Sequence, residues 1–549
     1  MILKINQLSL DSISGVLFIA VLSSLIIFPQ ALGFSKGRVG SFTMPSIRLF
    51  QLNTMDEDDD SSAADEKKDG LSIAKQRRVR FFASLPQVKF QQKKLYFGDE
   101  TDKDIVKTTI PNMLNYMVIP IVACVDTFWV GRLGDALALA GQSAAQQAFF
   151  TIYLLVSFIP NILAPSVASA ISSGNVKEAQ NRVKEALFLA IFLGAIGTVL
   201  LAFFPKFSLN MMVLSRDAPA MEYAVPYLRL RALALIPALV TSTGFAAFRG
   251  LLDTVTPLKV SLAANLFNLI ADPLLIFGVA GPLGAFIKGI GVRGAAIAIS
   301  GSQTLSGIVF LNLLLRKKLV TLRGIFELPS WKRLRPLIVG GFTVLIRQLA
   351  LNVAFLTPLS KAQSIDPSGV QAAAYGIVNQ IYSIGTVCNI AMQSSAAALV
   401  PSARAKGGDD AARKIADRAF AWGTIIGTVI AILQFSALPF ILPLFSTLPE
   451  VQEAVKVPAL ISCFVQLANG PLFAGEGVML GLECFRDLMF STGIGVIVMY
   501  GCLSSPLGKN LNGILFSMLV FNVYRAFAMV AHYFKIGPLS LDRTTRKVN

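Results

Sequence analysis

The stretch LAANLFNLIADPLLIFG, residues 262–278, is an apolar run interrupted by one acid, Asp272. A second run, PIVACVDTFWVG at residues 120–131, likewise contains a single acid, Asp126. A carboxylate at membrane depth costs several kcal/mol unless it is protonated, paired or hydrated, so an isolated acid there indicates a functional site. The two runs therefore predict a membrane protein whose buried acids bind and release a ligand or an ion.

The composition is also that of a membrane protein. Of the 549 residues, 54% are hydrophobic and only 15% are charged, against roughly 25% charged residues in an ordinary soluble domain. Apolar runs of about twenty residues, the length that crosses a bilayer, recur after residue 109. We therefore expect an all-α membrane protein with about twelve transmembrane helices. The predicted spans are 109–130, 144–172, 185–204, 223–247, 257–278, 292–315, 336–358, 370–400, 417–440, 453–480, 486–504 and 511–535.

Two distant segments resemble each other, which indicates an internal repeat. PSVASAISSGNVKEAQNRVKEA follows the second span from Pro165, and PSARAKGGDDAARKIADRA follows the eighth from Pro401. Each segment ends a helix, turns at glycine and begins a charged helix. We therefore expect two pseudo-symmetric six-helix lobes, at 105–318 and 337–536, joined by a linker at 319–336. Transporters built from such repeats bind substrate between them, near the membrane midplane.

Lysine and arginine are concentrated in the loops that follow even-numbered spans. Cytoplasmic loops carry such an excess of basic residues, so both ends of the chain are expected to face the cytosol-equivalent side, called the basic side below. The basic residues in these loops are Lys177, Arg182, Lys184, Arg249, Lys259, those from Arg316 to Arg335, Arg404, Lys406, Arg413, Lys414 and Arg418.

The two ends of the chain have the features of targeting and linker segments. Residues 1–34 combine a basic start, a short apolar run and a small-residue exit, as secretory signals do. Residues 35–104 begin without acids, as transit peptides do, and continue as a charged tail that cannot fold alone. This two-part leader resembles those of algae with secondary plastids and predicts a plastid envelope, with another secretory-pathway membrane as the alternative. Residues 537–549 are expected to form a C-terminal tail.

Several classes of function are disfavoured by the sequence. The net charge of +17 arises from loops and ends, not from a basic patch on a soluble domain, so no nucleic-acid partner is expected. Five cysteines without metal-type spacing and a single histidine, His532, exclude the usual zinc and triad constellations. We therefore expect no metal, no cofactor and no catalytic residue, and a monomer in the lipid bilayer.

Three stretches resemble the multidrug and toxic compound extrusion (MATE) family, and in particular its DinF-like branch. They are VDTFWVGRLGDALALAG from Val125, FRGLLDTVTPLKVSLAANLFNLIADPLLIFG from Phe248 and GVRGAAIAISGSQ from Gly291. The resemblance extends over residues 109–535. It implies the MATE fold and an antiporter that exports organic solutes in exchange for protons or sodium by alternating access.

The resemblance also places the coupling site. In the family, an acid of the first helix clusters with an asparagine and an acid of the fifth, and these roles fall on Asp126, Asn268 and Asp272. No lysine or arginine lies at comparable depth in spans one or five to pair with the acids. We therefore expect the acids to bind the coupling ion rather than to form a structural salt bridge. Pro111, which matches a family proline, and Pro120 are the predicted bending points of the first helix, because proline removes an intrahelical hydrogen bond.

The candidate substrate cavity contains Asn265, Gln303, Arg347 and Glu476. Asn265 shares a face of the fifth span with Asn268, three residues later. Arg347 either neutralises an anionic substrate through its planar guanidinium or ties down backbone carbonyls or Glu476. Glu476 stands where the family often has an acid in its tenth helix. Arg525, in the last span, is expected to snorkel towards the surface.

The favoured function is a proton-coupled antiporter for multidrug efflux. Protons are preferred over sodium because no second oxygen-rich site is evident, and the cavity arginine favours organic anions as the small solute. The alternative is a lipid-precursor flippase of the wider superfamily. A membrane enzyme would need dense acids on helices, but the dense acidic run Asp56–Asp60 lies in the predicted tail.

Overall fold

A computed structural model describes residues 98–156, 158–212, 219–278, 289–325, 327–365, 370–445 and 448–540. The chain divides into two compact units, Met1–Phe97 and Gly98–Asn549, and all described residues belong to the second. The predicted signal at 1–34, all but the last residues of the segment 35–104, and residues 541–549 of the predicted C-terminal tail lie outside the described residues. The expectation of an all-α fold is confirmed, since the described elements are helices.

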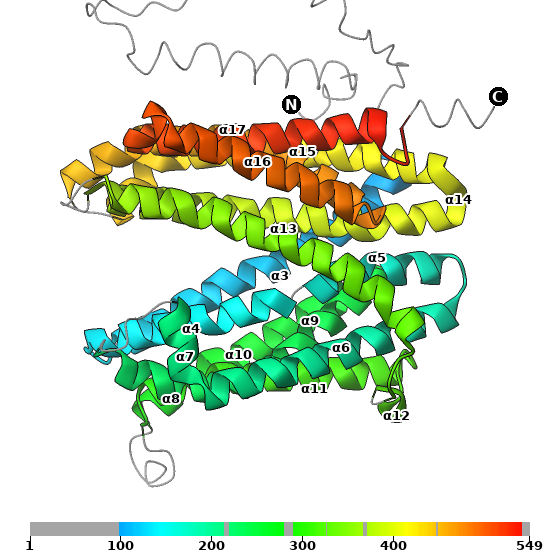
Figure 1. Ribbon diagram of the computed structural model, residues 1–549, viewed down its shortest axis with the longest axis horizontal. Helices are drawn as coiled ribbons and strands as arrows, with labels where there is room; N and C mark the ends of the chain where they lie inside the picture. Colours follow the sequence, from blue (N-terminus) through cyan, green and yellow to red (C-terminus); the bar gives the residue numbers. More distant parts are fainter. Residues whose placement is uncertain are drawn as a thin grey trace, which may run out of the picture. The chain divides into compact units, whose positions relative to one another are not determined.

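The first half of the described chain contains the helices drawn in blue to green in Figure 1. They are α3 (Glu100–Gly131), α4 (Ala136–Val156), α5 (Phe158–Ser172), α6 (Val176–Phe203), α7 (Pro205–Met212), α8 (Met221–Ala232), α9 (Leu235–Gly250), α10 (Val255–Phe277), α11 (Val292–Arg316) and the short α12 (Leu322–Ile325). Helices α8 and α9 form one bent pair, with an angle of 51° between them.

The second half begins with α13, whose first residue, Trp331, falls inside the predicted linker. Its helices are α13 (Trp331–Gln363), α14 (Val370–Phe445), α15 (Pro449–Gly481), α16 (Phe485–Ser504) and α17 (Leu511–Ala531), with the 3₁₀ turn η3 (Pro506–Lys509) and the π-helical turn η4 (His532–Ile536). The long α14 consists of two helices joined at Gly407 and Gly408, whose backbone angles are not helical.

The helices account for the predicted number of spans. Within the described ranges, nine helices are long and apolar enough to cross a membrane, and ten if the bent pair α8/α9 is one span. Helix α14 divides into two helices at its glycine break, and α3, with 32 residues, is also long enough to cross a membrane. With these two additions the helices match the twelve predicted spans.

The internal repeat is visible in the turns. Gly174 and Gly408, in the two similar segments, have φ values of +77° and +71°, which only glycine adopts without strain. The turns after α9 and α15 also share one pattern of backbone hydrogen bonds. Asp253 N donates to Phe248 O in the first turn, and Cys484 N donates to Met479 O in the second.

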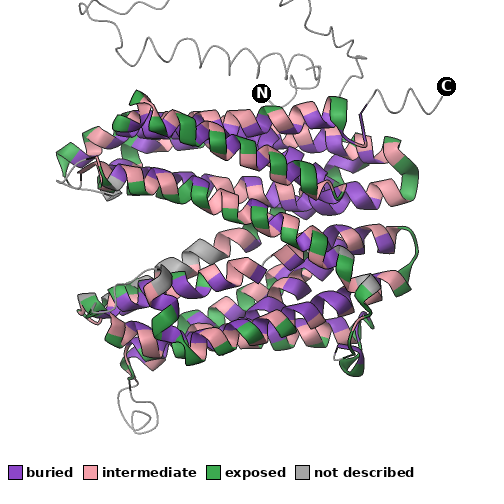
Figure 2. Ribbon diagram, viewed as in Figure 1, coloured by how far each residue is buried: buried purple, intermediate pink, exposed green. Residues whose placement is uncertain are grey.

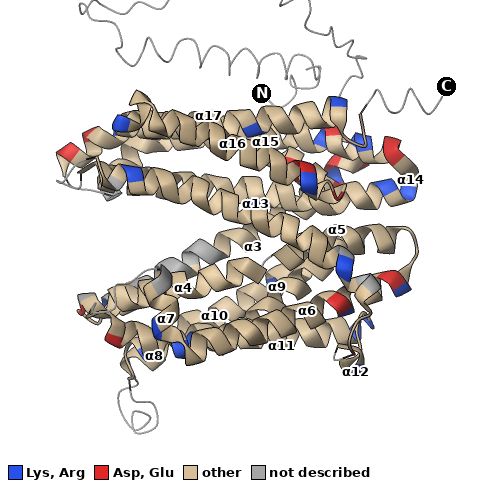
Figure 3. Ribbon diagram, in the orientation of Figure 1, with Lys and Arg blue, Asp and Glu red and all other residues tan. Residues whose placement is uncertain are grey.

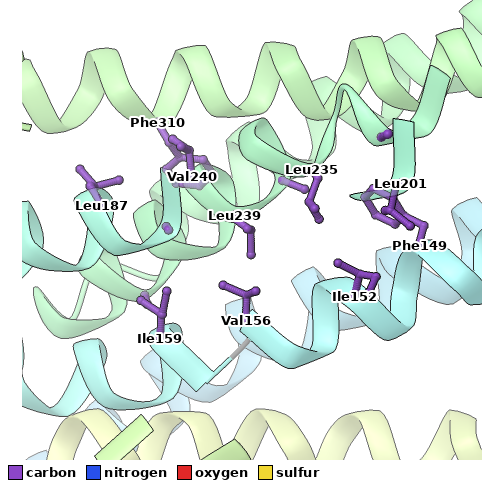
Figure 4. Packing of buried hydrophobic residues seen from close by; sticks show 14 of the residues in the cluster. Phe149, Ile152, Val156, Ile159, Leu187, Leu201, Leu235, Leu239, Val240 and Phe310 are labelled. Carbon is purple, nitrogen blue, oxygen red and sulfur yellow. The ribbon is translucent and has the colours of Figure 1, made fainter. Parts of the chain in front are cut away.

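Each half has its own buried core, coloured purple in Figure 2. In the first half, Ile152 of α4, Leu187 of α6, Leu239 of α9 and Phe310 of α11 converge on one cluster (Figure 4). Close packing replaces much of the hydrophobic driving force between helices in lipid. Accordingly, α14 and α15 meet at glycines, and a Cβ atom on Gly470 would lie 2.4 Å from the Gly423 carbonyl oxygen.

The halves touch through a few helices. Helices α3 and α5 of the first half pack against α14 of the second, and α5 also packs against α13. Figure 3 shows most charged residues near the ends of the helices. The charged residues that lie within the spans are therefore exceptions, and the candidate site contains several of them.

Candidate functional site

The predicted acids lie together inside the first half. Asp126 is on α3 and Asp272 is on α10, which pack against each other. Their carboxyl groups are neighbours, and Asn268, one helical turn before Asp272, lies beside them. The three side chains are at most 2% exposed. The structure thus brings together the three residues on which the MATE resemblance placed the coupling site.

These buried polar groups lack hydrogen-bond partners outside their own cluster in the described part of the chain. Neither the carboxylate oxygens of Asp126 and Asp272 nor the amide oxygen and nitrogen of Asn268 bond to any other residue there. Leaving a buried polar group unsatisfied costs about 1–3 kcal/mol, and more for a charged group. The cluster can therefore bind protons, a cation or water.

Arg231 also belongs to this site, although it was not predicted from the sequence. It lies on α8, is 3% exposed and acts electrostatically on Asp126. Its guanidinium stacks 3.9 Å from the ring centre of Phe149, and its Nη1 donates to Oε1 of Gln303 at 2.8 Å. The expectation that no lysine or arginine pairs with the acids rested on spans one and five alone. Helix packing instead brings Arg231 of span four close to Asp126. The signal was an arginine within the apolar run YLRLRALALIPAL.

The other predicted residues of the first half contribute less directly. Gln303 holds Arg231, as described above, whereas the Asn265 side chain is half-buried and donates to the Ser261 carbonyl at 2.7 Å. Pro111 and Pro120 both lie within the single helix α3. Bending of α3 at either proline stays a prediction.

In the second half, Glu476 of α15 lies between two arginines. Its Oε2 is 2.6 Å from Nη2 of Arg347 on α13, and its Oε1 accepts from Nη2 of Arg525 on α17. Gln393 donates to Oε2 at 2.9 Å, and Nε of Arg347 donates to Thr492 at 3.3 Å. Of the alternatives for Arg347, the structure therefore has the pairing with Glu476.

The expectation that Arg525 snorkels to the surface is wrong. Its side chain is 3% exposed and is held by Glu476 and by the ring of Phe521, whose centre is 4.8 Å from the guanidinium carbon. A buried carboxylate that holds one arginine can hold a second, because its two oxygens accept separately. With two arginines and one glutamate, this cluster has a net charge of +1.

The halves are joined at the basic side by buried polar contacts. Arg249 was assigned to a loop from the sequence, but it lies in the last turn of α9 and is 6% exposed. Its Nη1 donates to the hydroxyl of Tyr116 on α3 at 3.1 Å and also to the hydroxyl of Ser394 on α14. Nearby, Asn112 donates to Ser395 at 3.1 Å. We call Arg249, Tyr116 and Ser394 the basic-side lock.

Comparison with known proteins assigns this architecture. The profile of the MatE family matches residues 111–274 and 345–501, more than half of the chain. The chain belongs to the MatE family. The matched residues include Asp126, Asn268, Asp272, Arg347 and Glu476.

Individual relatives of this MATE protein agree with the assignment. It is 28% identical to Protein DETOXIFICATION 44, chloroplastic, of Arabidopsis thaliana over 412 residues, which cover 73% of this chain and 75% of that protein. It is 26% identical to the FAD transporter of Shewanella oneidensis over 451 residues, covering 78% and 93%. Its fold matches the outward-facing conformation of a multidrug resistance MATE family transporter with a TM-score of 0.72, at 18% identity, covering 80% of this chain and 97% of that one.

Membership of the MatE family makes this chain a multi-pass membrane transporter of small organic compounds. The matches favour this class over the lipid flippase that the sequence analysis held as the alternative. The first half of this MATE transporter contains a pair of buried acids, and the second half contains a buried cluster of two arginines and one glutamate. These are the charged groups with which the transporter could bind ions and solutes.

Removing the guanidinium of Arg249 should open the basic side of this MATE protein. The substitution Arg249→Met keeps the bulk of the side chain but removes the donors to Tyr116 and Ser394. A hydrogen bond with a charged partner contributes about 1.5–3 kcal/mol, which corresponds to a roughly 10- to 100-fold shift in the ratio of closed to open molecules. Spin labels at the exposed Lys177 and Lys406 should then report a longer distance across the basic side.

The matched control for this experiment is Arg316→Met. Arg316 is an exposed arginine in the last turn of α11 whose Nε donates to Asn312 of the same helix. Its replacement should leave the distance distribution unchanged. An unchanged distribution in Arg249→Met as well would mean that the basic-side lock does not hold the halves together.

Proposed function

We propose that this MATE transporter exports organic solutes, and organic anions in particular, in exchange for protons. The observation that carries the proposal is the buried cluster of Asp126, Asp272 and Asn268, whose polar atoms have no hydrogen-bond partner outside the cluster in the described part of the chain. Such a cluster is stable only when a proton, an ion or water compensates for the lost hydration. A site that needs a ligand in order to be buried can couple ligand binding to a change of conformation.

The charge of the first-half site favours a proton over sodium. When both carboxyl groups are ionised, the two acids and Arg231 together have a net charge of −1. One proton neutralises this charge on a carboxyl oxygen without displacing the guanidinium. A sodium ion would need several oxygen ligands next to a fixed positive charge, which repels it.

The charge of the second-half site favours an anionic solute. The cluster of Arg347, Glu476 and Arg525 is buried and has a net charge of +1. An anion entering between the halves would therefore be attracted to this side of the cavity. The relative that is named an FAD transporter carries a solute with phosphate groups, which has the same sign of charge.

The basic-side lock supports transport by alternating access. The contacts of Arg249 with Tyr116 and Ser394 join the two halves on the basic side. Export requires these contacts to break when the cavity turns towards that side to load solute. Relatives with "chloroplastic" in their names support a plastid membrane as the location.

The proposal is tested in proteoliposomes that contain the purified chain. A pH gradient should drive uptake of organic anions such as FAD or citrate, and a protonophore should abolish it. A sodium gradient of equal size, imposed at constant pH, should drive none. Transport driven by sodium alone would contradict proton coupling, and transport of organic cations without anions would contradict the proposed substrate class.

A further inference from the structure

A cluster of three potential metal ligands lies on the basic side, away from both sites described above. Cys484 is the N-cap residue of α16, Asp487 lies in its first turn, and His532 begins the π-helical turn η4 after α17. Their ligand atoms, a thiol sulfur, a carboxylate oxygen and an imidazole nitrogen, all lie within 4.8 Å of one another. In the part of the chain that the structure describes, no other three such side chains meet in this way.

The backbone holds His532 in place for this contact. The histidine is 6% exposed, and its Nε2 lies 3.1 Å from Oδ2 of Asp487. Its ring packs against Gly537, where a Cβ atom would lie 2.8 Å from Cε1 and 2.9 Å from Nδ1. Turns with π-helical geometry occur frequently at functional sites. The ring is thus positioned by a glycine and an unusual turn, with Nε2 directed at the cluster.

The internal repeat shows that Cys484 departs from its counterpart. The turn after α9 has Asp253 at the equivalent position, and its carboxylate accepts hydrogen bonds from the backbone N–H and the hydroxyl of Thr256 at the start of α10. Cys484 makes no side-chain cap hydrogen bond to α16, and its thiol donates instead to the Leu482 carbonyl oxygen at 3.7 Å. The second half therefore has a metal-ligating side chain where the first half has a helix cap.

We propose that Cys484, Asp487 and His532 bind Zn²⁺, with water as the fourth ligand. Sulfur, nitrogen and oxygen ligands together suit Zn²⁺, whereas Mg²⁺ and Ca²⁺ prefer oxygen alone. Tetrahedral zinc with ligands at about 2.0–2.3 Å needs ligand atoms roughly 3.3–3.7 Å apart. The ligand atoms of the cluster, which all lie within 4.8 Å of one another, would have to approach one another to reach this spacing.

The spacing of the cysteines along the chain and the single histidine predicted no zinc site. Cys484 and Asp487 are close in sequence, but the histidine comes from another helix, and α16 packs against α17 to bring them together (Figure 1). A bound ion would join these two helices next to a contact between the halves. Glu483, which precedes Cys484, accepts a hydrogen bond from Ser166 of α5 at 3.3 Å.

Cobalt spectroscopy on the full-length protein in detergent tests the proposal. Co²⁺ in place of Zn²⁺ should bind with one equivalent per chain and give tetrahedral visible bands together with a sulfur-to-cobalt charge-transfer band. Zn²⁺ should displace it. Absence of saturable binding would overturn the proposal, as would Co²⁺ that remains six-coordinate, because both indicate that the three side chains do not form a site.

Single substitutions identify the ligands. Cys484→Ser should remove the charge-transfer band and weaken Co²⁺ binding by at least about 100-fold, since even partners outside the ligand shell affect affinity by 10- to 100-fold. The control Cys502→Ser, on the same helix, should bind as the parent does. Asp487→Asn, at an exposed position, provides a second variant that leaves the fold intact. Retention of the charge-transfer band in Cys484→Ser, or equal binding in Asp487→Asn and the parent, would overturn the assignment.

Discussion

Replacing Asp126 or Asp272 by asparagine should abolish proton-driven transport while solute exchange continues. Asparagine has nearly the same shape as aspartate but cannot take up or release a proton, so either variant holds the first-half site in the state of an already protonated acid. Coupling free energies between sites are typically 1–3 kcal/mol, which corresponds to roughly 5- to 150-fold. Accumulation of solute driven by a pH gradient should therefore fall by a factor in that range, to the level seen without the gradient.

The two assays in this experiment separate coupling from binding. Solute counterflow without a pH gradient measures binding and movement of the halves and should persist in both variants. Uptake driven by the pH gradient measures coupling and should be lost. Asp410→Asn is the control, since Asp410 is an exposed acid between the two helices of α14. Full gradient-driven uptake in both Asp126→Asn and Asp272→Asn would exclude the acid pair as the coupling site.

The acid pair could be predicted from the sequence because its signal is local. A single carboxylate in an apolar run of span length is improbable without a function, and this holds for Asp126 and for Asp272 separately. The spacing of Asn268 and Asp272 places them on one helical face, and this too needs no tertiary information. The number of spans likewise follows from runs of apolar residues along the chain.

The partners of these residues could not be predicted, because they depend on how helices pack. Arg231 reaches the acid pair only because α8 folds back onto the first-half core, and Arg525 reaches Glu476 only because α17 packs against α15. Arg249 resembles a loop residue in sequence, since it precedes a glycine near the end of a span. Its burial results from the approach of α14, which belongs to the other half. Charge patterns along one helix do not contain this information.

The two charged sites have opposite signs of charge, and the proposed exchange would use them in turn. In that proposal, a proton neutralises the first-half site of Asp126, Asp272 and Arg231, and an anion neutralises the second-half cluster of Glu476 and its arginines. Because the two ligands are exchanged, each is bound in its own half of the transport cycle. Burial of a charge is costly, so each bound ligand removes the cost of burying the charge of its own site.

The substitution Glu476→Gln should destabilise the transporter severely. It leaves Arg347 and Arg525 both buried, with no carboxylate between them. Removing one partner of a buried ion pair typically costs about 3–5 kcal/mol, because the remaining charge is uncompensated. In this cluster the two guanidiniums would also repel each other. The free energy of unfolding, measured by titration with a denaturing detergent, should fall by at least that amount.

Two further variants separate this structural role from the attraction of anions. Glu450→Gln, at an exposed position in the first turn of the same helix, should change the free energy of unfolding by less than about 0.5 kcal/mol. Arg347→Met leaves Glu476 paired with Arg525 and reduces the net charge of the cluster from +1 to zero. It should therefore fold better than Glu476→Gln but lose anion counterflow. Equal stability of Glu476→Gln and Glu450→Gln would mean that the buried arginines do not depend on Glu476, and normal anion counterflow in Arg347→Met would mean that the positive charge of the second half does not select the solute.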